Sequence, residues 1–346
     1  MVATVPRGVP LVIDHLSPSL LTIDEMDSLR DAARLLKRAR ITGAPVLDGS
    51  SLSGILSRND LLRAIDKIPS ETSVAEFDIK LEAIQKQEVW QIMSESPMTI
   101  QPEVSLLAAA RVMQEKKLNR LMVKAQFSTM LGIISSTDIV FTLLGCTTEA
   151  CADMEISDYL LRAPEDTDHS DDGLCSLGTT VSEHMATSLY VMRPDMSLGD
   201  AARLLRAAKI TGAPVVDYND QTVGVVSRND LLKALAARVS PDVEAAGTFA
   251  TAIEELKASK VSSLMNDTPI TVSADAPMLE AAKMMAQSKL NRLMVTGPKD
   301  DALCGIISST DVVFAMLGCT YTLDNDSSLE DDGERRIGNL YRKGIY

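Results

Sequence analysis

The chain has 346 residues, of which 45% are hydrophobic and 24% are charged, and this composition is typical of folded domains with sizeable cores. A prior of about 150 residues per domain predicts two domains. The net charge of −14 and the aromatic content of 3% argue against a nucleic-acid surface, which needs basic and aromatic side chains. Charged residues interrupt every apolar run well before the roughly 20 residues of a membrane span, so we expect no membrane segment.

The cysteines are odd in number and have no short paired spacing, which argues against a zinc ligand set and a secreted disulfide framework. They are Cys146, Cys151, Cys175, Cys304 and Cys319. We therefore expect a reducing compartment, with the cytoplasm as the default. The first residues resemble neither a signal peptide nor an Arg-rich transit helix, so an organellar stroma or matrix would require that a leader has been removed.

The predicted elements begin with a strand at residues 20–23 and a helix from about residue 27, whose apolar residues recur at three- and four-residue spacing. Two strands follow at 44–47 and 52–56, joined by a turn at Asp48-Gly49, and a second helix starts near Asn59. The order β-α-β-β-α recurs from about residues 98, 190 and 270. The sequence thus predicts four subrepeats of a mixed α/β, or α+β, fold.

A longer segment is also repeated. Residues 41–45, Ile-Thr-Gly-Ala-Pro, recur at 210–214, and residues 57–62 recur at 227–232. A different segment, 118–123, recurs at 290–295. The chain is therefore one two-subrepeat unit present twice.

Units of about 50 to 60 residues bury a sheet poorly alone, so we expect the first subrepeat to pair with the second and the third with the fourth. The predicted boundaries are module 1 at 12–146, with subrepeats at 12–68 and 89–146, and module 2 at 181–320, with subrepeats at 181–238 and 261–320. Residues 147–180 are rich in acidic side chains and read as a solvated linker, and 321–346 as a polar tail.

The strand pattern apolar-x-Gly-x-Pro-Val at 41–46 and 210–215, and the junction Gly-apolar-apolar-Ser-x-x-Asp, resemble CBS domains, the regulatory units named after cystathionine beta-synthase. The junction occurs at 54–60, 132–138, 224–230 and 305–311. The resemblance implies tandem pairs, called Bateman modules, with clefts that in many members hold AMP, ADP, ATP or S-adenosylmethionine. It also implies an intrachain disk of four units. The segments 77–93 and 249–265 resemble the insert of small plant CBS-pair proteins that are associated with thioredoxin control.

The resemblance implies a set of nucleotide contacts in the strands and junctions. They are Thr42, Gly43, Ala44, Pro45, Ser57, Arg58, Asn59, Asp60, Asn119, Arg120, Ser135, Thr137, Asp138, Thr211, Gly212, Ala213, Pro214, Ser227, Arg228, Asn229, Asp230, Asn291, Arg292, Ser308, Thr310 and Asp311.

The chemistry of the junction supports these roles. A Ser that closes a strand lies at a helix N-terminus, where free N–H groups favour a phosphate. The Asp three residues later can accept both ribose hydroxyls, and a Gly lets the backbone approach an adenine. Ser-x-x-Asp is also close to a helix capping box, which needs no ligand, and the two roles are compatible. We expect the strongest ribose contacts at Asp60 and Asp230.

The second and fourth subrepeats depart from the family pattern, because Arg120 and Arg292 replace the Gly and Met122 and Met294 replace the Pro. The guanidinium groups could reach phosphate, or equally be surface charges or pair with linker acids.

Other signals are weak. The histidines, His15, His169 and His184, have no ligand spacing, and a partial calcium-loop pattern at 168–179 has Thr179 where the bidentate Glu belongs. We expect no metal site, no obligatory cofactor and a structural role for Cys146 and Cys319. No nucleophile and base pair stands out, so we expect no enzyme.

The sequence leaves two hypotheses. The first is a regulatory, energy-sensing protein that binds an adenine nucleotide and transmits occupancy to a protein partner, either an enzyme or a thioredoxin-like protein. The alternative is a ligand-independent interaction scaffold, which a thioredoxin-type partner could link to redox state. A homodimer remains open, and we expect no nucleic-acid or membrane partner.

Overall fold

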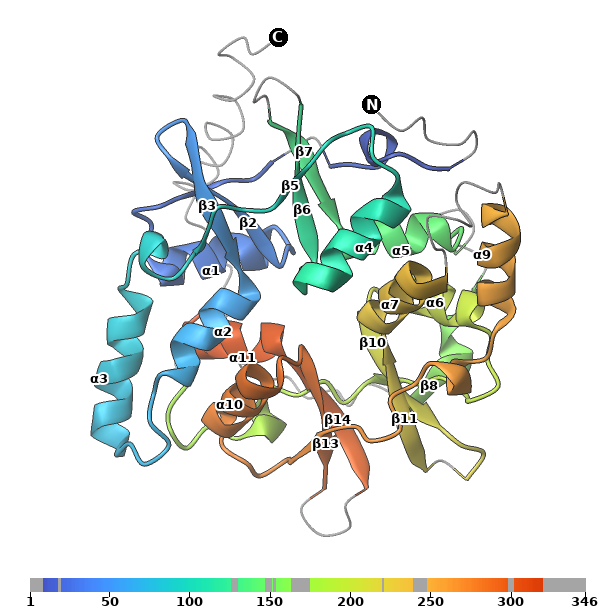
Figure 1. Ribbon diagram of the computed structural model, residues 1–346. Coiled ribbons are helices and arrows are strands. Elements are labelled where there is room, and N and C mark those ends of the chain that lie inside the picture. Colours follow the sequence, from blue (N-terminus) through green and yellow to red (C-terminus); the bar gives the residue numbers. More distant parts are fainter. Residues whose placement is uncertain are drawn as a thin grey trace. The chain divides into compact units, whose positions relative to one another are not determined.

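The computed structural model describes residues 9–17, 20–125, 130–146, 151, 154–162, 175–219, 221–238, 248–297 and 302–319 (Figure 1). The chain divides into two compact units. Unit 1 comprises Met1–Ser19, Met98–Ala163 and Leu189–Pro269, and unit 2 comprises Leu20–Pro97, Pro164–Ser188 and Ile270–Tyr346. Unit 1 therefore holds the second and third subrepeats, and unit 2 holds the first and fourth.

The predicted order β-α-β-β-α is confirmed in all four subrepeats. In unit 2 the first subrepeat consists of β1 (Ile23–Asp24), α1 (Leu29–Arg38), β2 (Gly43–Asp48), β3 (Ser51–Ser57) and α2 (Arg58–Asp66), and the fourth of β12 (Thr271–Ser273), α10 (Met278–Ser288), β13 (Arg292–Thr296), β14 (Leu303–Ser308) and α11 (Ser309–Met316). In unit 1 the second consists of β5 (Thr99–Ile100), α4 (Leu106–Lys116), β6 (Arg120–Lys124), β7 (Met130–Ser135) and α5 (Ser136–Leu143), and the third of β9 (Leu189–Tyr190), α6 (Leu198–Ala207), β10 (Gly212–Val216), β11 (Thr222–Ser227) and α7 (Arg228–Arg238).

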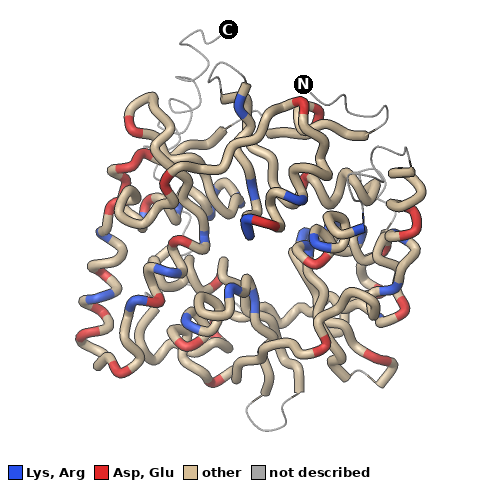
Figure 2. The backbone as a smooth tube through the Cα atoms, in the orientation of Figure 1, with Lys and Arg blue, Asp and Glu red and all other residues tan. Residues whose placement is uncertain are grey.

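Additional elements connect the subrepeats. They are η1 (Val12–Asp14), α3 (Val74–Gln85), η2 (Val89–Gln91), β4 (Ser94–Glu95), η4 (Ile156–Tyr159), β8 (Leu160–Arg162), η5 (Val181–Glu183), α9 (Phe249–Ala258) and η6 (Val261–Ser263). Helix α3 buries Phe77 and Leu81 and carries charges of both signs along its length (Figure 2). The helical insert expected between paired subrepeats is therefore present as α3 and α9.

Helix packing explains why the units combine distant subrepeats. In unit 2, α2 contacts α10 and α11, and in unit 1, α7 contacts α4 and α5. Each unit has its own apolar cluster, which includes Leu61, Ile65 and Val313 in unit 2 and Ile139, Val140 and Leu232 in unit 1. Burial of such side chains stabilises each unit by about 1.5–3 kcal/mol per residue. The modules predicted from the sequence, 12–146 and 181–320, pair the subrepeats differently, first with second and third with fourth. They stay a prediction.

Segments are exchanged between subrepeats. The edge of β3 pairs with β4, which lies at the start of the second subrepeat, and Ile133 in β7 pairs with Ser17, which lies at the start of the first. In the same way Val225 in β11 pairs with Asn266, and Ile306 in β14 pairs with Ala186. Each junction strand is thus covered by the segment that leads into another subrepeat.

Parts of the expected linker at 147–180 pack against the two units. Strand β8 pairs with β9, Met154 and Ile156 pack on the core of unit 1, and Cys175 belongs to the core of unit 2. Apolar side chains at these positions bury surface that a solvated linker would expose. Residues 147–150, 152–153 and 163–174, and the tail at 321–346, lie outside the described residues. Within the described part of the chain, no helix has the length and apolar character needed to cross a bilayer.

Candidate functional site

All four Ser-x-x-Asp junctions form capping geometry. At each one the Ser backbone N–H and the Ser hydroxyl both donate to the same Asp oxygen, Oδ2. The hydroxyl distances are 2.6 Å at Ser57, Ser135 and Ser227 and 2.7 Å at Ser308. A complete capping box forms at α2, α5 and α11, which confirms the capping interpretation there, and these contacts form without a ligand.

The four Asp side chains differ in what they offer a ligand. The second oxygen of Asp60, Oδ1, accepts from the Arg63 guanidinium and from Ser94 Oγ at 3.1 Å, and the residue is 3% exposed. Among the described residues, the side chains of Asp138, Asp230 and Asp311 accept hydrogen bonds only through Oδ2, and each residue is partly buried. Asp60, which we expected among the strongest ribose contacts, is therefore the most occupied of the four.

The strand before each junction lies directly opposite it. The register pairs Gly43 with Ser57 and Gly212 with Ser227. It pairs Arg120 with Ser135 and Arg292 with Ser308. Residues opposite each other in an antiparallel pair direct their side chains to the same face, about 5 Å apart.

The remaining predicted strand residues adjoin these pairs. The carbonyl oxygens of Thr42, Asn119, Thr211 and Asn291 accept hydrogen bonds from the first residue of the following helix, at 2.9–3.0 Å. Ala44, Pro45, Ala213 and Pro214 are buried in their strands, so their backbone atoms rather than their side chains are the groups available for a base. Asn59 is exposed, and Asn229 and Thr137 are partly buried, each at its helix N-terminus.

The junctions within one unit also meet each other. In unit 2 the Arg58 guanidinium donates to Thr310 Oγ1, so the first subrepeat's arginine lies at the fourth junction. Burial raises the pKa of Asp311, while hydrogen bonds from Ser308 and the charges of Arg58 and His184 oppose that rise. In unit 1 burial lowers the pKa of Arg228, and the charge of Asp138 opposes that change.

The sequence interpretation missed two serines. Ser136 and Ser309, the first residues of α5 and α11, are fully buried, and their hydroxyls have no hydrogen-bond partner among the described residues. A buried hydroxyl without a partner costs about 1–3 kcal/mol, which makes these positions notable. The repeated Ser-Ser-Thr-Asp at 135–138 and 308–311 was the available signal.

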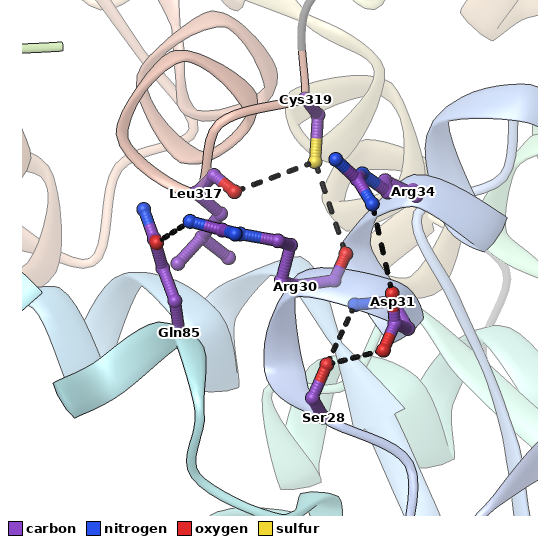
Figure 3. Close-up of polar contacts among 7 residues, drawn as sticks. All are labelled: Ser28, Arg30, Asp31, Arg34, Gln85, Leu317 and Cys319. Atoms are coloured by element: carbon purple, nitrogen blue, oxygen red, sulfur yellow. Dashed lines mark hydrogen bonds and ion pairs between the residues drawn. The ribbon is translucent and has the colours of Figure 1, made fainter. Parts of the chain in front are cut away.

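Cys319 lies just after the C-terminus of α11, and its buried side chain belongs to a cluster of polar residues from α1 and α3 (Figure 3). Burial raises the pKa of its thiol to about 11, although Lys37, Arg34 and Arg30 act in the opposite direction. Lys37 donates to the Cys319 carbonyl oxygen, and Gln85 Nε2 donates to the Met316 carbonyl at 3.0 Å. These donors satisfy carbonyls at the helix C-terminus, so the cluster has a structural explanation.

Cys146, at the matching position in unit 1, is equally buried. Burial raises the pKa of Cys146 to about 12 and that of Cys175 to about 11. Thiols with such values are protonated at neutral pH and react slowly. These properties support the structural role expected for Cys146 and Cys319.

No group of three or more His, Cys, Asp or Glu side chains in the described part of the chain could hold a metal ion. His169 and most of the partial calcium-loop pattern lie outside the described residues.

A family model described as "CBS domain" matches residues 12–67, 89–145, 181–237 and 261–318. The CBS domain-containing protein CBSX2, chloroplastic, of Arabidopsis thaliana is 32% identical over 164 residues, which cover 43% of this chain and 68% of that protein. A solved structure of CBSX2 in complex with AMP covers 41% of this chain and 98% of that chain, at 33% identity and a TM-score of 0.33. Protein MJ1225 of Methanocaldococcus jannaschii is 22% identical over 249 residues, which cover 72% of this chain and 76% of that protein.

Proposed function

This chain belongs to the CBS domain family, and on that premise we propose that it is a regulatory protein that binds an adenine nucleotide and transmits occupancy to a protein partner. The observation that carries the proposal is the set of carboxylate oxygens on Asp138, Asp230 and Asp311 that the capping boxes leave without hydrogen bonds from the described residues. The AMP complex of CBSX2 supports an adenine nucleotide as the ligand class.

The junction atoms have distinct roles in this proposal. The helix N-terminus attracts the phosphate, because it carries a partial positive charge. The free Asp oxygen accepts from the ribose hydroxyls. Buried strand backbone beside the junction, as at Ala213 and Pro214, forms an edge for the adenine.

Regulation requires two states with different affinities for the ligand. A nucleotide that contacts two subrepeats favours the arrangement in which both contacts form, and the population shifts by the difference in binding free energy. A partner that recognises one arrangement then responds to nucleotide concentration. We propose no catalytic step for this chain, and AMP, ADP, ATP and S-adenosylmethionine are all candidate ligands.

The scaffold remains the second candidate because the capping boxes of α2, α5 and α11 are complete without a ligand. In a scaffold the junctions only stabilise helices, and a partner docks regardless of nucleotide. Exposed apolar side chains such as Ile79 and Trp90 would then contribute to the docking surface.

Isothermal titration calorimetry of the full chain with the four ligands separates the two functions. The proposed function predicts saturable binding of at least one nucleotide at or below millimolar concentration. Inosine monophosphate is the matched control, because it keeps the phosphate and ribose but changes the base. Absence of heat with every ligand, together with unchanged thermal unfolding in their presence, would favour the scaffold.

A further inference from the structure

The segments that lead into the first strand of the first and third subrepeats occupy matching places. Met192 pairs in parallel with Val215 in the third subrepeat, as Ile23 pairs with Val46 in the first, at a shift of 192 − 23 = 169 residues. Residues 189–191 therefore match residues 20–22, and the surroundings of the two segments can be compared residue by residue.

In unit 1 another strand covers this segment. Strand β8 runs antiparallel to β9, with Leu160 opposite Tyr190. The Val191 N–H donates to the Tyr159 carbonyl oxygen at 2.8 Å. Leu189 in β9 is 1% exposed. The covering strand comes from the residues that follow Cys146, at the end of the second subrepeat.

In unit 2 the matching segment lies at the edge of its sheet. The strand order is β1-β2-β3-β4, and within the described part of the chain no strand pairs with residues 20–22. Leu20, the counterpart of Leu189, is only partly buried. Unpaired N–H and C=O groups at a sheet edge form a template for another strand.

The chain leaves unit 2 beside the helix that follows this edge. Cys319, the counterpart of Cys146, is the last described residue, and its thiol lies 4.0 Å from the Arg30 carbonyl oxygen of α1 (Figure 3). Lys37, also in α1, donates to the Cys319 carbonyl oxygen. The residues after Cys319 number 346 − 319 = 27, and 16 of them in extended form reach up to about 50 Å.

The tail contains a segment that resembles β8 and the residues before it. Residues 156–162 read Ile-Ser-Asp-Tyr-Leu-Leu-Arg, and residues 337–343 read Ile-Gly-Asn-Leu-Tyr-Arg-Lys. Both begin with Ile, continue with a small residue and an Asp or Asn, and then have two bulky side chains and a basic end. Leu340 and Tyr341 thus match Tyr159 and Leu160.

The charges of the edge and of the covering segment differ between the two units in opposite directions. Residues 24–27, Asp-Glu-Met-Asp, have a charge of −3, whereas the matching residues 193–196, Arg-Pro-Asp-Met, have a charge of 0. Residues 335–343 contain four cations and no acid, a charge of +4, whereas 154–162 contain two acids and one arginine, a charge of −1. The more acidic edge therefore has a basic counterpart in its own chain, and opposite charges favour the pairing.

The residues that lead to this segment fit a route along α1. Residues 324–334 contain six acidic side chains. Helix α1 has Arg30 and Arg38 at the positions where α6 has Gly199 and Ala207. The helix beside which the chain leaves unit 2 is thus more basic than its copy, and the acidic part of the tail complements it.

We propose that residues 337–343 pair antiparallel with residues 20–22 and extend the sheet of unit 2, as β8 extends that of unit 1. In this register Tyr341 lies opposite Leu21, and the Thr22 N–H donates to the Leu340 carbonyl oxygen. Strand addition of this kind takes its affinity from main-chain hydrogen bonds and its specificity from side chains. The inference goes beyond the proposed function and does not depend on nucleotide binding.

Hydrogen–deuterium exchange of the full chain, with mass spectrometry of the peptides that contain residues 20–22 and 337–343, tests the pairing. The variant is Tyr341→Pro/Arg342→Pro. Because the N–H groups of a strand alternate between its two sides, one of these adjacent prolines removes an N–H that faces the edge. Exchange of both peptides should accelerate at least tenfold, since paired amides exchange only when the pairing opens. Ser327→Pro/Ser328→Pro, in the acidic part of the tail, is the matched control and should change neither rate.

A chain that ends at Glu334 provides a second variant, which keeps the acidic residues and lacks the proposed strand. Exchange at residues 20–22 should rise in it as much as in the double-proline variant. Equally fast exchange at residues 20–22 in the wild type and in the double-proline variant would overturn the inference. Protection that persists in the chain ending at Glu334 would also overturn it and assign the edge to another segment or, if light scattering shows twice the chain mass, to a second copy. None of these variants changes a junction residue, so failure of the pairing leaves the proposed function intact.

Discussion

Asp60 shows how one residue type at four equivalent positions acquires different roles. Its carboxylate has hydrogen bonds to both oxygens, from Ser57 on one side and from Arg63 and Ser94 on the other. Ser94 comes from the exchanged strand β4, which pairs with β3 but lies far from the Asp60 junction in sequence. Asp60 therefore stabilises the fold, whereas Asp138, Asp230 and Asp311 each keep one carboxylate oxygen available for a ligand.

We predict that Asp60→Asn lowers the free energy of unfolding by about 1.5–3 kcal/mol, because an amide cannot accept all the donors that the carboxylate accepts. Nucleotide affinity should stay within error of the wild type. Urea denaturation and calorimetry measure the two quantities. Asp230→Asn is the matched control, since its carboxylate loses fewer contacts; an equal loss of stability in both variants would contradict this account.

The buried thiols predict how stability depends on pH. The pKa of Cys319 is about 11 in the folded chain, compared with an ordinary value of 9.0. Between these values the unfolded chain loses the thiol proton and the folded chain retains it, so the folded state binds more protons. The free energy of unfolding must therefore fall as pH rises from about 9 to 11.

Cys319→Ala should reduce this pH slope by about 1.4 kcal/mol per pH unit, the value for one group. Denaturant unfolding at several pH values from 8 to 11 measures it. Cys304→Ala serves as the control, because Cys304 is only partly buried. An unchanged slope in Cys319→Ala would mean that the thiol ionises in the folded protein as readily as in the unfolded one.

At the scale of elements, each junction strand needs a glycine because another segment crosses it closely. A Cβ on Gly132 would lie 2.5 Å from the Ser17 carbonyl oxygen, and a Cβ on Gly305 would lie 2.5 Å from Met185 Sδ. A methionine side chain can move aside, but the Ser17 backbone is held by its hydrogen bonds with Ile133. The two glycines therefore tolerate substitution differently.

We predict that Gly132→Ala destabilises the chain by about 1–3 kcal/mol and Gly305→Ala by less. Met185→Ala added to Gly305→Ala should recover part of the loss, because it removes the colliding atom. Leu16→Ala added to Gly132→Ala should not, since the backbone collision remains. Thermal unfolding measures all four; full rescue by Leu16→Ala would contradict the exchanged-segment packing.

The elements within one subrepeat could be predicted from the sequence because their signals are local. Apolar spacing predicted α1, and the turn at Asp48-Gly49 with its flanking strands predicted β2 and β3 to within one residue at each end. The segment exchange could not be predicted, because Ser94 and Glu95 lie at the start of the second subrepeat in sequence but pair with β3 of the first. Strand pairing over such distances depends on tertiary packing, which a local pattern does not contain.

In the candidate site, too, the local features could be predicted from the sequence and the long-range contacts could not. The motif identified Ser57, Asp60 and their equivalents as a capping geometry, since both partners lie within four residues. Which carboxylates remain available, and where the Arg58 guanidinium lies, depends on elements from another subrepeat. Burial and contacts with residues far away in sequence determine both features. The local motif does not contain this information, so it could not show that both oxygens of Asp60 are already hydrogen-bonded.

At the scale of the whole molecule, both compact units contain segments from before and after residues 163–174. We predict that cutting the chain at a protease site inserted there leaves the two halves associated, because helix α2 packs against α10 and α11. Size-exclusion chromatography with light scattering measures the mass after cleavage. Separate elution of the halves at micromolar concentration would contradict the packing in both units. The intrachain disk stays a prediction.

The measurement that tests the central claim most directly is equilibrium dialysis of radiolabelled AMP against the wild-type chain and the Asp138→Asn/Asp230→Asn/Asp311→Asn triple variant. The wild type should bind AMP saturably, and the triple variant should bind with at least tenfold lower affinity while circular dichroism shows an intact fold. Undiminished binding by the folded triple variant, or no binding by the wild type at millimolar AMP, would contradict the account.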